Sequence, residues 1–161
     1  TGCAYLILRT SWVYGAAGDN FCRTVWRLAR EQNELRMVHD QTGSPTWART
    51  IASTTRALIE KCGAQIRDVH NIVHVAGAGA AGRDVFAAEI LRLLARRFGE
   101  TAAKAKRVVP VSSDEFRTPA ERPPYSALST DKLRTKFGIE LRPWEDDLAE
   151  FISTSPENVW Q

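Results

Sequence analysis

An apolar run of four residues, Tyr5 to Leu8, stands near the start of this 161-residue chain and constrains its fold more than any other segment. A continuous apolar run of this kind is typical of a strand buried on both faces of a parallel sheet. Such a strand needs neighbours, and nothing that precedes it in these residues supplies them. We therefore expect the chain, which also begins without a methionine, to be part of a larger α/β protein.

Strand and helix patterns alternate along the rest of the chain. Apolar spacing predicts strands at 5–8, 35–38, 71–75 and 107–111, and helices that begin at Asn20, Pro45, Asp84, Asp131 and Pro143. The expected buried faces include Phe21, Val25, Leu28 and Ala29 in the first helix, Leu58 and Ile59 in the second, and Trp144, Leu148, Phe151 and Ile152 in the last. Asp19 or Asn20 can cap the first helix, and Gly63 can end the second. Residues Ser112 to Glu115 have capping-box spacing and predict a short helical turn.

Composition and cysteine content limit the function classes. No apolar run approaches the ~18 residues of a membrane span, and the N-terminus has no signal-peptide pattern. Cys3, Cys22 and Cys62 are odd in number and lack C-x-x-C spacing, which favours free thiols in a reducing cytoplasm. The net charge of +3 is small, and no aromatic residues interleave with the basic ones. We therefore expect a cytoplasmic protein with neither membrane nor nucleic acid as a partner.

Three polar motifs carry the features of a ligand site: Arg9 to Gly15, Gly18 to Phe21, and Asp40 to Thr46. The first follows the apolar strand, at the carboxyl edge where open α/β sheets bind ligands. Each motif also has a structural explanation. Trp12 can be a core aromatic, and Asn20 a plain helix cap beside a core Phe21.

The three motifs resemble those of the dTDP-4-dehydrorhamnose reductases, extended short-chain dehydrogenases/reductases that make dTDP-L-rhamnose, a building block of cell-wall polysaccharide. The similarity continues through Arg122 to Leu128 and to Trp144-Glu145, so it covers nearly the whole chain. It implies an α/β fold that combines the C-terminal part of a doubly wound NAD(P)-binding Rossmann fold with a smaller substrate-binding lobe. Residues 1–30 and 46–76 would complete the cofactor domain, and residues 31–45 and 77–161 would lie mainly in the substrate lobe.

The resemblance also implies roles for individual residues. The nicotinamide end of NADPH or NADH would contact Arg9, Thr10 and Ser11. The dTDP-sugar would be bound by Trp12, Asn20, Phe21, Gln41, Ser44, Thr46, Arg122 and Ser126. Trp12 would pack against the deoxysugar ring, and Arg122 would grip the diphosphate. Arg9 can instead be an ion-pair partner and Ser44 a helix cap, whereas Gln41 and Thr46 are better explained by a ligand.

The catalytic parts of the resembling family lie upstream of the Arg9 to Gly15 motif. The three tyrosines, Tyr5, Tyr14 and Tyr125, are not followed by a lysine at the fourth position, so no Tyr-x-x-x-Lys motif is present. We therefore expect the C-terminal half of a reductase that converts dTDP-4-dehydro-L-rhamnose to dTDP-L-rhamnose. This half would bind the sugar nucleotide, be inactive alone, and pair with the missing N-terminal half; a homodimer is left open. The alternative is a non-catalytic NADP-binding regulatory subunit resembling that of methionine adenosyltransferase.

Residues Gly77 to Gly82 form a literal G-x-G-x-x-G after a predicted strand and before a helix, as in a dinucleotide fingerprint. The next strand contains Pro110, however, and Asp114, the first acidic residue beyond that strand, lies 32 positions after Gly82. An acidic ribose partner is expected at about 20. We interpret the glycines as a tight turn, with an autonomous dinucleotide module as the alternative. Gly82-Arg83 stands where the resembling family commonly has an aromatic pair, which argues against a substrate contact from that turn.

Overall fold

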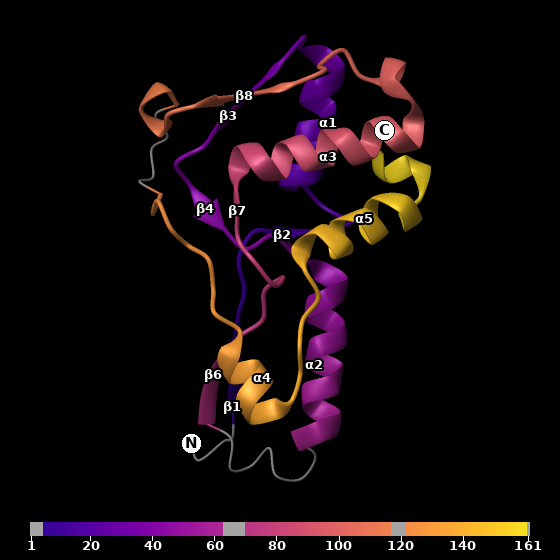
Figure 1. The fold of residues 1–161 in the computed structure, drawn as a ribbon. Coiled ribbons are helices and arrows are strands. Elements are labelled where there is room, and N and C mark those ends of the chain that lie inside the picture. Colours follow the sequence, from indigo (N-terminus) through magenta and orange to yellow (C-terminus); the bar gives the residue numbers. More distant parts are fainter. Residues whose placement is uncertain (1–4, 63–69, 117–121, 161) are drawn as a thin grey trace.

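The computed structural model describes residues 5–62, 70–116 and 122–160 (Figure 1). Its α-helices are α1 (Phe21–Glu31), α2 (Ala48–Cys62), α3 (Arg83–Phe98), α4 (Asp131–Phe137) and α5 (Trp144–Thr154). Its strands are β1 (Tyr5–Arg9), β2 (Val13–Tyr14), β3 (Leu35–Val38), β4 (Thr42–Gly43), β5 (Thr46–Trp47), β6 (His70–His74), β7 (Ala81–Gly82) and β8 (Val108–Val111). Short 3-10 turns are η2 (Glu100–Ala102), η3 (Ser113–Glu115) and η4 (Glu157–Trp160).

The strands pair two by two in the described part of the chain. β1 pairs with β6, β2 with β5 and β3 with β8, all in parallel, while β4 pairs antiparallel with β7. Every pair joins segments that are far apart in sequence. The alternation of strands and helices agrees with the predicted α/β class.

The expectation that the first strand is buried on both faces is wrong for this chain. Leu6 and Leu8 pack against the core, but Ile7 on the opposite face is 47% exposed. Its partner on β6, Ile72, is 38% exposed. The physical reason is that β1 has β6 as its only strand partner among the described residues, and one face of this two-stranded ribbon is left uncovered.

Two hydrophobic clusters form the core. The larger one lies between α1, α3 and α5 and includes Val25, Phe86, Ile90, Leu148 and Phe151, all buried. The smaller one joins α2, β6 and α4 through Leu58, Val73, Val75 and Leu133. Figure 1 shows the smaller cluster's elements at the N-terminal end of the molecule and the larger cluster's helices at the other end. The packing places α1 with α3 and α5, and α4 with β1 and β6. The division into cofactor domain and substrate lobe stays a prediction.

Local signals account for several helix ends. Asn20 caps α1 by accepting a hydrogen bond from the Arg23 backbone N–H, and the predicted capping box at Ser112 and Glu115 is present. Gly138 ends α4 with a left-handed φ of 59°. The predicted buried face of α5 is confirmed, since all four of its expected residues are buried.

The start and the inner face of α2 differ from the prediction. The helix begins at Ala48 rather than Pro45, because Thr46 and Trp47 first pair with β2. Ile59 is 58% exposed, since no described segment covers that side of the helix, although Leu58 is buried as expected. Gly63, the expected end signal, lies outside the described residues.

Two further expectations concern thiols and membranes. Cys22 is a buried free thiol; Cys3 and the side chain of Cys62 lie outside what the structure describes. None of the helices in the described ranges has the length and apolar character needed to cross a bilayer.

Candidate functional site

Parts of the three polar motifs meet where α1 and α3 begin. Trp12 lies in the turn between β1 and β2, Phe21 begins α1, and Gln41 immediately precedes β4. The first residue of α3, Arg83, lies among them, with its Cζ 4.6 Å from the centroid of the Trp12 ring and 5.5 Å from that of Phe21. The Phe86 ring stacks on Phe21 at 5.5 Å. These five residues are called the aromatic–arginine cluster below.

Trp12 is held in a strained turn. Its φ of 43° lies in the left-handed region, which costs a non-glycine residue on the order of 1 kcal/mol or more. Its carbonyl accepts a hydrogen bond from the Thr46 N–H at 3.2 Å. Its ring lies so close to Gly43 that a Cβ there would be 2.3 Å from Cε2. Such strain persists where the surrounding contacts hold the residue in place, and strained residues are common at ligand sites.

Arg83 is the charged member of the cluster, and the sequence did not predict it as a site residue. Its backbone N–H donates to the Gln41 carbonyl at 3.2 Å, and its Nε donates to the Gln41 side-chain Oε1 at 3.1 Å. The side chain is half-buried, and it forms no ion pair with any residue that the structure describes. Burial lowers the pKa of Arg83, and the positive charge of Arg122 lowers that pKa further. Among the residues that the structure describes, no carboxylate therefore forms an ion pair with the Arg83 charge.

Asn20 is accounted for by its capping role. Its Nδ2 donates to the carbonyls of Gly15 at 2.8 Å and Gly18 at 3.3 Å, while its Oδ1 accepts from Arg23. The side chain thereby closes the turn before α1 and sets the position of Phe21. Its predicted contact with the sugar nucleotide stays untested, and the structure supplies a complete set of partners without one.

Ser44 and Thr46 are fully buried and serve as internal connectors. The Ser44 hydroxyl donates to the Gly79 carbonyl at 3.1 Å and accepts from the Leu128 N–H at 3.3 Å, so it does not cap α2 as expected. The Thr46 hydroxyl donates to the Ser44 carbonyl at 3.0 Å and accepts from the Gly77 N–H at 3.2 Å. The Thr46 hydroxyl thus has two internal partners, and its predicted contact with a ligand stays a prediction.

The loop that carries Arg122 and Ser126 is tied to the start of β4. The Thr42 N–H donates to the Pro124 carbonyl at 2.8 Å, and the Ser126 N–H and hydroxyl both donate to the Thr42 carbonyl at 2.8 and 3.1 Å. Arg122 is exposed, and no described residue pairs with it. The loop thus lies beside Gln41, and Arg122 is near enough for its charge to act on Arg83.

The residues expected at the cofactor lie at the carboxyl end of β1. Arg9 and Thr10 are exposed, and Arg9 forms no ion pair in the described part of the chain. Arg9 borders an open hollow of about 440 Å³ with Ile72 and His74 of β6. Ser11 is turned inward, with its hydroxyl donating to the Ser126 carbonyl at 3.4 Å. Exposed donors at the carboxyl edge of two parallel strands fit one end of a nicotinamide dinucleotide.

The glycine-rich segment is a packed turn rather than a phosphate cradle. A Cβ on Gly77 would lie 2.3 Å from the Pro45 carbonyl oxygen, and one on Gly79, whose φ is +95°, would lie 3.3 Å from Cδ1 of Trp144. The strand after α3 pairs with β3 instead of β6. A dinucleotide fingerprint needs glycines open to the pyrophosphate within a βαβ unit, so the geometry favours the turn interpretation.

Within the ranges that the structure describes, no group of three histidine, cysteine or acidic side chains could hold a metal ion. His74 instead bonds through Nδ1 to the Ser129 carbonyl at 3.0 Å.

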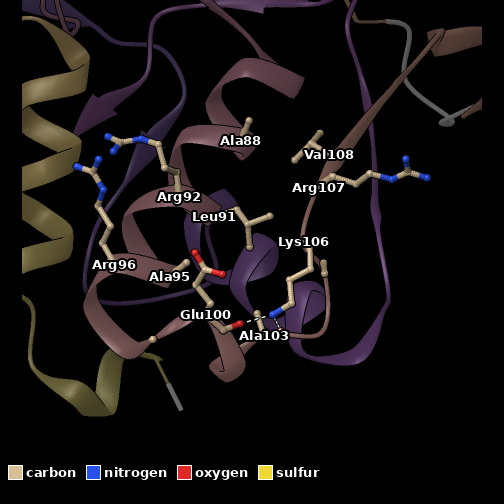
Figure 2. A pocket seen from close by; sticks show the side chains of 12 residues that line it. Ala88, Leu91, Arg92, Ala95, Arg96, Glu100, Ala103, Lys106, Arg107 and Val108 are labelled. Carbon is tan, nitrogen blue, oxygen red and sulfur yellow. Dashed lines mark hydrogen bonds between the residues drawn. The ribbon is translucent and has the colours of Figure 1, made fainter.

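A separate cavity of about 710 Å³ lies at the other end of α3 (Figure 2). Its lining includes the basic residues Arg92, Arg96, Lys106 and Arg107. Most of these charges are already satisfied: Arg92 and Arg107 pair with glutamates, and the Lys106 ammonium donates to backbone carbonyls, as the dashed lines in Figure 2 show. None of the predicted site residues lines this cavity, so the aromatic–arginine cluster remains the candidate site.

Comparison with known proteins gives a consistent result. A family model described as RmlD substrate binding domain matches residues 1–156. A dTDP-4-dehydrorhamnose reductase of Burkholderia thailandensis is 38% identical over 149 residues, which cover 89% of this chain and 49% of that protein. The corresponding reductase of Escherichia coli K12 is 37% identical over 145 residues, covering 89% and 47%.

Solved structures agree in fold. A dTDP-4-dehydrorhamnose reductase of Clostridium acetobutylicum superposes with a TM-score of 0.77 at 35% identity, covering 92% of this chain and 48% of that one. The Bacillus anthracis reductase, solved in complex with NADP, gives a TM-score of 0.77 at 33% identity, covering 94% and 49%. The chain spans about half the length of the relatives it matches. The predicted fold class and the resemblance stated from the sequence are thereby confirmed.

Proposed function

Because this chain belongs to the RmlD substrate-binding domain family, we propose that it forms the sugar-nucleotide-binding half of an NADPH- or NADH-dependent dTDP-4-dehydrorhamnose reductase. The relatives reported above are named as reductases, which supports an oxidoreductase over a regulatory subunit of the same fold. The substrate, the cofactor and the activity of the whole protein are part of this proposal.

One observation carries the proposal: Trp12, Phe21 and Gln41, from three separate motifs, converge beside the loop of Arg122. An aromatic face and an amide side chain next to an exposed guanidinium are what a deoxysugar joined to a diphosphate requires. The Trp12 and Phe21 rings would border the C–H side of the sugar. Arg122 would bind phosphate oxygens in a bidentate manner.

The chain's own residues position the substrate. A bound nicotinamide cofactor would supply the hydride that reduces the 4-keto group of the sugar. Arg9 and Thr10, exposed at the carboxyl end of β1, would hold the nicotinamide end of that cofactor. The proton for the new hydroxyl would come from the tyrosine of a Tyr-x-x-x-Lys motif, which this chain does not contain. We therefore propose a role in binding and orientation for these 161 residues.

Isothermal titration calorimetry tests the proposal. The 161-residue chain is titrated with dTDP-L-rhamnose, and with UDP-glucose as a control of different base and sugar. Saturable binding of dTDP-L-rhamnose that is tighter than that of UDP-glucose is expected. Equal binding of the two, or none of either, would contradict the proposed function.

A further inference from the structure

We propose that Arg83 is a second anion-binding residue of this site, and that together with Arg122 it binds the diphosphate of the nucleotide sugar. The inference rests on the proposed function, and it assigns a role to a residue that the sequence pattern had set aside. It is carried by the contacts of the Arg83 guanidinium.

The Arg83 side chain is fixed from three directions. Its Cζ lies over the Trp12 ring at 4.6 Å and over the Phe21 ring at 5.5 Å, and its Nε is bonded to Gln41 at 3.1 Å. These contacts use only one of the five N–H donors. Neither Nη nitrogen donates to an atom of the described residues, so four donors remain for a ligand. An aromatic support that holds a guanidinium in place reduces the entropy lost when it binds.

In the described part of the chain, the Arg83 charge has no carboxylate partner. Asp40, one residue before Gln41, is engaged by the Ser113 backbone N–H at 2.9 Å and by the Ser113 hydroxyl at 2.8 Å. No carboxylate in the described ranges lies within ion-pair distance of Arg83. A half-buried guanidinium without a counter-ion has lost part of its hydration shell. Binding of an anion is therefore favoured, because the anion replaces the lost water.

Arg122 supplies the second charge. Arg83 bonds to Gln41, and the next residue, Thr42, bonds to Pro124, two residues after Arg122. Two guanidiniums carried by adjoining segments repel each other unless an anion lies between them. A diphosphate carries charge on two adjacent groups and accepts bidentate bonds from arginine, so it fits this pair.

Calorimetry on the 161-residue chain with dTDP and with thymidine, which lacks phosphate, tests the inference. Arg83→Met keeps an unbranched side chain against the two rings but removes every donor. We expect Arg83→Met to weaken dTDP binding about tenfold or more, because a charge-assisted hydrogen bond is lost. Thymidine binding should be unchanged. Arg96→Met is the matched control, because Arg96 is an exposed arginine on the same helix. It should alter dTDP affinity less than about twofold.

The outcomes separate the two claims. If the wild-type chain and Arg83→Met bind dTDP equally, the inference is overturned and the proposed function stands. If the variant loses dTDP and thymidine in equal measure, Arg83 only shapes the pocket and the inference is also overturned. Absence of dTDP binding in the wild type overturns both claims. Arg83→Lys decides the matter if Arg83→Met does not fold: an ammonium lacks the bidentate fork, so a several-fold loss is expected and wild-type affinity contradicts the inference.

Discussion

Thr50 on α2 donates a hydrogen bond of 2.5 Å to the Oδ2 oxygen of Asp147 on α5, and the Asp147 side chain is buried. The bond joins a helix of the smaller core to a helix of the larger one. Arg142, with its Nη1 3.6 Å from the other carboxylate oxygen, is the only further partner among the described residues. Together with the ion pair of Arg49 and Glu150 at 3.1 Å, this bond connects α2 to α5.

Thr50→Val should lower the free energy of unfolding by about 1–3 kcal/mol, because the buried Asp147 carboxylate loses a donor that water cannot replace. Thr50→Ser keeps the hydroxyl and serves as the control. Urea unfolding followed by circular dichroism measures both variants. Equal stability of Thr50→Val and the wild type would show that the bond contributes nothing.

Trp12→Ala should weaken the binding of dTDP-L-rhamnose by about 1 kcal/mol or more, since both the aromatic face and the support of Arg83 are lost. Trp12→Phe retains an aromatic ring and should lose less. Calorimetry gives the affinities, and thermal unfolding shows whether each variant is folded. Unchanged affinity in a folded Trp12→Ala variant would rule out this role.

Gly77→Ala should destabilise the chain by about 1–3 kcal/mol, because the added methyl group meets the Pro45 carbonyl and Trp144. Gly18→Asn is the control: nothing lies within 4 Å of its Cβ position, and asparagine tolerates its left-handed backbone. Both are measured by urea unfolding. The competing dinucleotide interpretation predicts instead that the chain binds NADPH and that Gly79→Val abolishes this binding.

Stability should fall in acid through Asp40. Hydrogen bonds from the Ser113 backbone and hydroxyl lower the pKa of the Asp40 carboxyl below its ordinary value of 3.8. A carboxyl whose pKa is lower in the folded state contributes stability above its unfolded pKa, and this contribution is lost as the pH falls through the folded pKa. Asp40→Asn should therefore flatten the decline of the urea midpoint below about pH 4, relative to the wild type. Parallel curves for the two proteins would contradict the assignment.

The uncovered face of β1 and β6 should make the isolated chain self-associate. Ile7 and Ile72 expose apolar surface side by side, and such surface favours association. Replacing both with threonine, which keeps the branching suited to a strand, should reduce dye binding and shift sedimentation toward the monomer. Val85→Thr, at another exposed apolar residue, is the control and should change neither. A wild-type chain that sediments as a monomer and binds no dye contradicts the expectation.

The elements that could be predicted from the sequence are those with local signals. The cap at Asn20, the helix end at Gly138 and the buried face of α5 each follow from residues within a few positions of one another. The start of α2 could not be predicted, because Thr46 and Trp47 pair with a two-residue strand more than thirty positions away. A strand of two residues is too short to show the alternating apolar pattern by which a strand is predicted from sequence.

The candidate site shows the same limit. Trp12, Phe21 and Gln41 could be selected as a group from their motifs, and the structure brings them together. Arg83 could not, since its position depends on the antiparallel pairing of β4 with β7. Ser44 and Thr46 carry polar groups typical of ligand contacts, and only their burial and internal bonds show another use.

Thr42 pairs with Gly82 and forms a bridge with Tyr125, so one residue fixes segments from three distant parts of the chain. Closing loops of this length costs entropy that is repaid only when the distant contacts form. The helices with local signals can form early, whereas the aromatic–arginine cluster needs the closure that pairs Thr42 with Gly82. The site is therefore expected to be among the last parts of the chain to become native during folding, and a substitution at Thr42 should slow its appearance.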